Sequence, residues 1–60
     1  SSKKDFINKI FICKKESRET KYWLHLLPSV CPEVKDDCKN LWQEAHEFTL
    51  IFSKITIKAK

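Results

Sequence analysis

Four side chains of this sequence are the softest metal ligands available, His25, Cys31, Cys38 and His46. A structural zinc site holds four such groups in a tetrahedron and usually draws them from close pairs such as Cys-x-x-Cys. Here Cys31 and Cys38 are seven residues apart, and neither histidine has a ligand partner at helical spacing. The pattern therefore predicts no metal site, and a buried cysteine is expected to pack as a small apolar side chain.

Four glutamates, Glu16, Glu19, Glu44 and Glu47, are the only candidates for paired catalytic carboxylates. A di-metal site in a helical bundle needs Glu-x-x-His on two helices, and that motif does not occur. No nucleophile has an adjacent base at helical spacing. The chain contains no glycine, which excludes the phosphate-binding loops of nucleotide sites. We expect a protein that is not an enzyme and that needs no cofactor.

Positive charge is concentrated in the first half, where seven basic and three acidic side chains precede a second half with five of each. Phe11 and Tyr22 are interleaved with the basic residues and could offer stacking surfaces. The sequence therefore predicts a weak nucleic-acid-binding surface, for RNA or DNA, on the first helix. The competing interpretation is an ordinary lysine-rich solvated face on a pure assembly module. The candidate binding residues are Lys4, Lys14, Lys15, Arg18 and Lys21.

A second polar group, Glu16, Arg18, Glu19 and Thr20, lies in the middle of this segment and partly on its apolar side. A bundle cannot bury charge without pairing it. We expect Glu16, Glu19 and Thr20 to be structural, forming ion pairs and hydrogen bonds between helices that fix their register.

The elements that would carry these residues are two helices. Apolar or small residues advance by alternating steps of four and three, which is the period of one helical stripe. The stripes are Phe6, Ile10, Cys13, Ser17, Thr20, Leu24 and Leu27, then Val34, Cys38, Leu41, Ala45, Phe48, Phe52 and Ile55. The predicted core consists of Phe6, Ile10, Leu24, Leu27, Leu41, Phe48, Phe52 and Ile55.

Local signals set the expected ends of these helices. Ser2 followed by Asp5 resembles a capping box, so the first helix should begin near Lys3. Pro28 disfavours helical angles at the preceding residue, which predicts a helix over about 3–27, a loop over 28–32 and a second helix over about 33–57. Ser29 or Cys31 could cap the second helix.

A short loop makes two such helices antiparallel, so the expected fold is an all-α helical hairpin. Trp23 and Trp42 widen the apolar faces beyond what one seam needs, which predicts completion of an up-and-down four-helix bundle. The partner would be a second copy or a missing N-terminal half of the same polypeptide. The odd number of cysteines favours a reducing, cytoplasmic location, and no run of about 18 apolar residues suggests a membrane span.

The segment 16–24, Glu-Ser-Arg-Glu-Thr-Lys-Tyr-Trp-Leu, resembles the third helix of the bacterial 23S rRNA intervening-sequence proteins. The segment 44–48, Glu-Ala-His-Glu-Phe, with 51–55 after it, is similar to the fourth helix of that family. The resemblance implies half of a left-handed four-helix bundle, often assembled as a homopentamer. Relatives include the accessory protein of diversity-generating retroelements, which implies a basic surface for nucleic acid. Arg18 and Glu19 fall in its most specific part.

Overall fold

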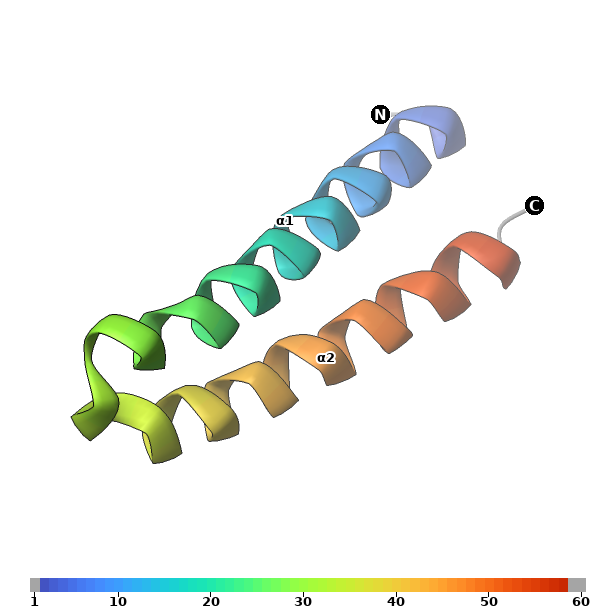
Figure 1. Cartoon of the computed structure of the whole chain (residues 1–60). Helices are drawn as coiled ribbons and strands as arrows, with labels where there is room; N and C mark the ends of the chain where they lie inside the picture. The colour runs from blue at the N-terminus through green and yellow to red at the C-terminus, as the bar shows by residue number, and fades with distance from the viewer. Residues whose placement is uncertain (1, 59–60) are drawn as a thin grey trace.

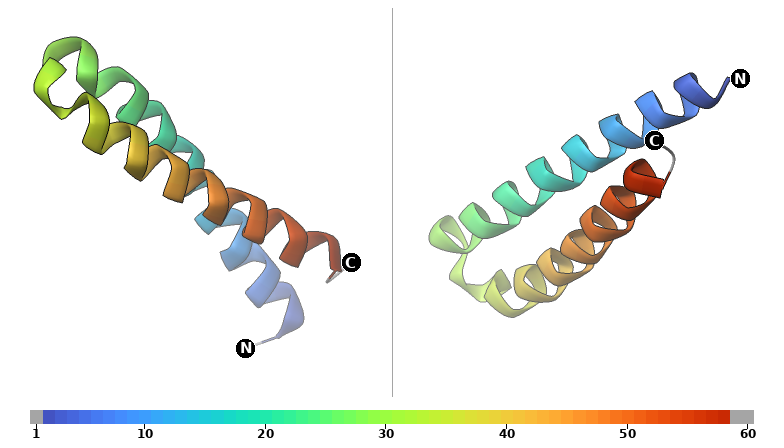
Figure 2. Two further views of the ribbon diagram at one scale, coloured as in Figure 1. Left: turned by 90° about the horizontal axis from the view of Figure 1, so that it is seen from below. Right: turned by 90° about the vertical axis from the view of Figure 1, so that its right-hand side faces the viewer.

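The chain folds into an antiparallel helical hairpin, as the sequence predicts. The computed structural model describes residues 2–58, which form helix α1 (Lys3–Val30), a 3-10 turn η1 (Pro32–Val34) and helix α2 (Lys35–Lys58), with no strand among them. Figure 1 shows the two helices side by side, with both ends of the chain opposite the connection. The views in Figure 2 show that the helices cross at a small angle.

Helix α1 begins where the sequence predicts and ends later. The Ser2 hydroxyl accepts a hydrogen bond from the Asp5 amide at 3.2 Å, which confirms the predicted cap. The expected end before Pro28 is wrong, because the helix continues through Pro28 to Val30. Two bonds support this last turn: the Cys31 amide donates to the Leu27 carbonyl at 2.9 Å, and the Ser29 hydroxyl donates to that of Leu26 at 2.6 Å. Pro28 removes the amide donor to the Leu24 carbonyl and its ring crowds that carbonyl, and the helix ends two residues later.

The connection is consequently shorter than the predicted loop. Ser29 belongs to the last turn of α1 and does not cap the second helix. Cys31 precedes Pro32, and its carbonyl accepts a hydrogen bond from the Val34 amide at 3.2 Å. Asp36 and Asp37 lie in the first turn of α2, where the helix dipole favours negative charge.

Small side chains of α2 form the seam between the helices. The buried residues of the described chain are Cys38, Ala45, Thr49 and Thr56, all on α2. Each threonine hydroxyl is satisfied within its own helix, Thr49 by the Ala45 carbonyl at 3.0 Å and Thr56 by that of Ser53 at 2.9 Å. These polar side chains therefore occupy the seam without an unpaired group, and their small volume lets the helices approach closely.

The predicted core is partly wrong, because on each helix several residues that face the partner helix are shifted by one position from the predicted stripe. Phe6, Leu27, Leu41 and Phe48 are exposed, with 43–55% of their surface accessible, whereas Ile10, Leu24, Phe52 and Ile55 are half-buried. The stripe that faces the partner helix instead passes through Trp42, Thr49 and Thr56. Size is the reason at two positions, because Thr49 and Thr56 allow closer packing than Phe48 and Ile55 would. Trp42, which replaces Leu41, is half-buried and lies against Lys21 and His46.

The hairpin is elongated and exposes more surface than a compact protein of its mass. Its radius of gyration is 14.1 Å, against about 10 Å for a compact 60-residue domain. Its accessible surface is 4958 Å², against about 4,100 Å² expected for a folded monomer of this mass. Neither α1 nor α2 has the length of apolar sequence that crossing a bilayer requires.

The tight seam predicts that Ala45→Leu destabilises the hairpin. Ala45 is 8% exposed, so three additional carbon atoms would crowd the seam at a cost of about 1–3 kcal/mol. Urea denaturation followed by circular dichroism would measure the loss. Gln43→Leu adds leucine at an exposed position of the same helix and serves as the control, and equal stability of both variants would argue against a close seam.

Candidate nucleic-acid interface

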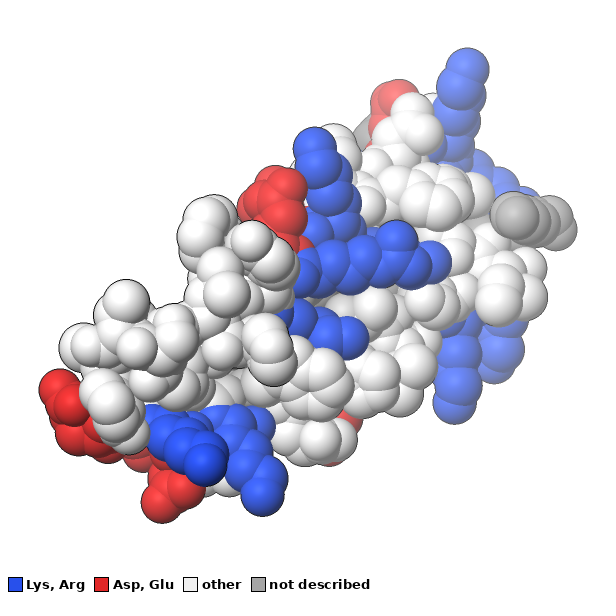
Figure 3. Space-filling view, viewed as in Figure 1, with Lys and Arg blue, Asp and Glu red and all other residues white. Residues whose placement is uncertain are grey.

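The hairpin has two broad sides with different chemistry. On one side, which we call the basic face, lie Lys14, Arg18, Lys21 and His25 of α1 and Lys35, Lys39, Trp42 and His46 of α2. Within each helix these residues follow steps of four and three, so they share one side of it. Figure 3 shows basic side chains along the length of this face, with acidic groups mainly at its edges.

A cluster of three side chains joins the two helices at the centre of the basic face. The Lys21 ammonium donates to His46 Nδ1 at 2.9 Å and lies 4.7 Å from the centre of the Trp42 ring. The Trp42 and His46 rings stack at 5.1 Å with 14° between their planes. An ammonium has no acceptor, so Nδ1 of His46 must be unprotonated in this contact. The cluster fixes the orientation of Trp42 and places a cation against its ring.

An open concave site of about 340 Å³ lies beside this cluster, toward the connected end of the hairpin. Its lining comes from Leu24, His25 and Pro28 of α1 and from Lys35, Cys38, Lys39 and Trp42 of α2. The site therefore combines apolar contacts, an aromatic ring, an imidazole and two ammonium groups. That combination suits an anion with a planar ring.

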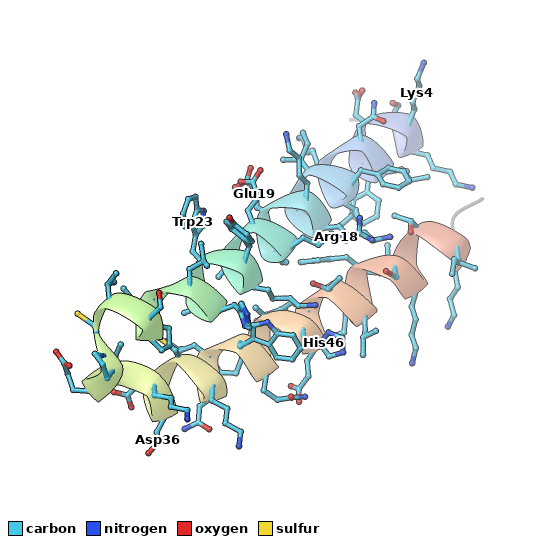
Figure 4. The ribbon with its side chains drawn as sticks, in the orientation of Figure 1. Lys4, Arg18, Glu19, Trp23, Asp36 and His46 are labelled. Atoms are coloured by element: carbon cyan, nitrogen blue, oxygen red, sulfur yellow. The ribbon has the colours of Figure 1, made fainter. Side chains whose placement is uncertain are left out.

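The structure brings some of the predicted binding residues together and separates others. Arg18 reaches toward the gap between the helices, on the side where His46 lies (Figure 4). Lys14 and Lys21 are half-buried on the same stripe of α1. Lys4 lies near the start of α1, 14 residues or about 21 Å along the helix from Arg18. Lys15 is exposed but follows Lys14 directly, so it lies about 100° around the helix from that stripe.

Half of the basic face comes from α2, which the sequence reasoning missed. Lys35 and Lys39 line the same site as His25, so the basic surface is not confined to the first helix. Counting charge along the chain concealed them because the second half is neutral overall. Asp36, one of the acids that cancel this charge, points away from α1 (Figure 4). The four-three spacing of Lys35, Lys39, Trp42 and His46 was the signal that could have found them.

The predicted polar bridges between helices do not form within the described hairpin. The Thr20 hydroxyl donates to the Glu16 carbonyl of its own helix at 2.9 Å. Glu19 is exposed and points away from α2, as does Trp23 (Figure 4). Glu16 lines a groove together with Glu44, and two carboxylates cannot pair with each other. Within this hairpin Glu16, Glu19 and Thr20 therefore make no contact that fixes the register of α1 against α2, and their structural role in a larger bundle stays a prediction.

The opposite side carries a row of large apolar residues, and we call it the apolar face. Leu41 is two residues, or about 200° around α2, from Lys39 of the basic face. Phe48 and Phe52 stack on this side at 6.2 Å. Its centre is a groove of about 360 Å³, lined by Ser17, Thr20, Leu24, Leu41, Ala45 and Phe48 with Glu16 and Glu44. The apolar face consists of Phe6, Cys13, Thr20, Leu24, Leu27, Leu41, Phe48, Phe52 and Ile55.

Residues 2–58 contain no group of three or more histidine, cysteine, aspartate or glutamate side chains placed to hold a metal ion. Comparison of the chain with protein-family models, curated proteins and solved structures gives no match.

Proposed function

We propose that this protein is a non-enzymatic helical hairpin that self-associates through its apolar face and binds nucleic acid through its basic face. The observation that carries the proposal is that lysine and arginine side chains follow one side of the hairpin, whereas a groove lined by Leu41 and Phe48 lies on the other. Self-association can cover the apolar side and leave the basic side open to solvent. Two hairpins joined in this way would form an up-and-down four-helix bundle.

Exposed apolar surface supports the self-association. Only four described residues are buried, and none of them is a large side chain. Phe48 is 55% exposed and Leu41 49%, and they adjoin on the same face, so together they leave an apolar patch in water. The surface in excess of a compact monomer, roughly 850 Å², matches the roughly 800 Å² that each partner buries in a standard interface.

Charge and aromatic rings support the nucleic-acid binding. The net charge of +4 is modest, but most of the side chains that define the basic face are lysine or arginine. Lysine and arginine neutralise phosphates, and an aromatic ring among them can stack on a base. Trp42 satisfies the second requirement because His46 and Lys21 already hold it in place.

The alternative is a pure assembly module whose lysines serve only solubility. The resemblance to the 23S rRNA intervening-sequence proteins remains a proposal that favours the nucleic-acid interpretation. It also allows a different partner for the apolar face, namely an N-terminal half of the same polypeptide. A cytoplasmic location is part of the same proposal.

Salt separates the two functions in one preparation. We expect sedimentation at micromolar concentration to show a dimer or larger species that persists as salt rises, since apolar association does not depend on counterions. Fluorescence anisotropy should show binding of a labelled single-stranded RNA that weakens about tenfold or more between about 50 and 200 mM salt. A folded monomer would contradict the assembly, and absence of RNA binding at low salt would leave only the assembly module.

A further inference from the structure

The concave site beside Trp42 has features that a simple basic surface does not need. Leu24, Pro28 and Cys38 give it an apolar floor, and Cys38 is only 3% exposed. A surface that only attracts phosphates would present cations on convex helices. A volume of about 340 Å³ lies within the range of roughly 300–1,000 Å³ for sites that hold small organic groups.

Trp42 forms one wall and is held in position from the other side. His46, one turn later in α2, stacks on it, whereas Cys38 and Lys39, one turn earlier, line the site. An aromatic ring held in this way loses little freedom when another ring stacks on it, which favours binding.

The polar groups of the site suit a base that carries a phosphate. Lys35 and Lys39 are exposed, are four residues apart on one side of α2 and provide two ammonium groups at the rim. His25, from α1, supplies ring nitrogens that can donate to or accept from the edge of a base. No acidic side chain lines this site, so nothing there repels a phosphate.

We propose that this site binds one unstacked base of a single-stranded nucleic acid, with the base against Trp42 and its phosphate at Lys35 and Lys39. The inference rests on the proposed nucleic-acid binding and deepens it. A double helix is excluded as the preferred ligand because its bases are stacked and cannot enter a side pocket. A free nucleotide offers the same chemistry, so the test must distinguish it from a strand.

The test uses the full chain with Trp23→Phe, which leaves Trp42 as the sole tryptophan. Three ligands are titrated at low salt: single-stranded oligo-dT, an abasic oligomer of equal length and thymidine monophosphate. We expect oligo-dT to quench Trp42 emission and to bind more tightly than both other ligands, because it alone offers bases and many phosphates. The abasic oligomer should bind without quenching.

A matched pair of variants measures the contribution of the ring. Trp42→Leu should weaken oligo-dT binding about five- to one-hundred-fold and leave binding of the abasic oligomer unchanged. Trp23→Leu, on the outer side of α1, should change neither. Circular dichroism verifies that both variants stay helical, and the quenching experiment decides the question even if Trp42→Leu does not fold.

The failures are distinguishable. Equal affinity for oligo-dT and the abasic oligomer, without quenching, would overturn the base site while the proposed nucleic-acid binding stands. Thymidine monophosphate binding as tightly as oligo-dT would assign the site to free nucleotides and overturn the single-strand assignment. If neither oligomer binds at low salt, the proposed function fails together with the inference.

Discussion

Phe48→Glu is expected to yield a monomer if the hairpin self-associates through its apolar face as proposed. Phe48 lies at the centre of the apolar face and is 55% exposed in the hairpin. Full burial of a phenylalanine contributes about 1.5–3 kcal/mol, so association can still gain the part that corresponds to this exposed surface. A carboxylate there would add an unpaired charge to an interface that already contains Glu16 and Glu44. Because a two-fold dimer suffers the change in both copies, we expect the dissociation constant to rise at least about 100-fold, or about 2.7 kcal/mol.

Leu50→Glu is the matched control for this experiment. Leu50 is 51% exposed, close to the 55% of Phe48, but it lies four residues after His46 and so belongs to the other side of α2. Sedimentation across a concentration series, with circular dichroism at each point, should show dissociation only for Phe48→Glu. Dissociation of Leu50→Glu alone would place the interface on the basic face and contradict the proposed arrangement.

The parts of the fold that could be predicted are those decided by local chemistry. The start of α1 follows from one hydroxyl, that of Ser2, and one amide three residues later, so the sequence is sufficient to find it. The end of α1 is different. Pro28 is compatible with a last helical turn when Cys31 and Ser29 supply the bonds that complete it, and the sequence does not show whether they do.

The seam could not be chosen from periodicity because two stripes of α2 have the same period. The predicted stripe through Leu41 and Phe48 shares Cys38, Ala45 and Phe52 with the observed stripe through Trp42 and Thr49. Both advance by four and three. Hydrophobicity favours the first, but close packing of one pair of helices favours the smaller residues of the second. If the hairpin is half of the proposed four-helix bundle, the more apolar stripe of α2 would face the other two helices.

The candidate site was only half predictable for a related reason. Lys14, Arg18 and Lys21 stand out in a basic segment, whereas Lys35 and Lys39 are surrounded by Glu33, Asp36 and Asp37. The net charge is a sum over the whole sequence, whereas a ligand interacts mainly with the charges on the face that it contacts. Which cations of α2 lie beside those of α1 depends on the rotation of both helices about their axes. That rotation is set by the small buried residues of the seam, and at the observed rotation Lys21 contacts the Trp42–His46 pair.

Reversing three charges on the basic face should strongly weaken nucleic-acid binding. Arg18, Lys35 and Lys39 are exposed and none of them belongs to the seam, so their replacement by glutamate should leave the hairpin and its apolar face intact. Each reversal removes a phosphate contact and adds a repulsive charge. We expect binding of single-stranded RNA at low salt to fall at least about tenfold, or about 1.4 kcal/mol, and the salt dependence of the remaining binding to become shallower.

A control with the same net charge separates position from total charge. Lys3→Glu, Lys54→Glu and Lys58→Glu change the charge equally but lie toward the other ends of the helices, away from the connected end and the concave site beside Trp42. Lys54 is 15 residues, or about 22 Å along α2, from Lys39. If attraction were only a property of the net charge of +4, both triple variants would lose the same affinity. A binding face built from both helices requires that affinity falls further in the variant of Arg18, Lys35 and Lys39 than in this control.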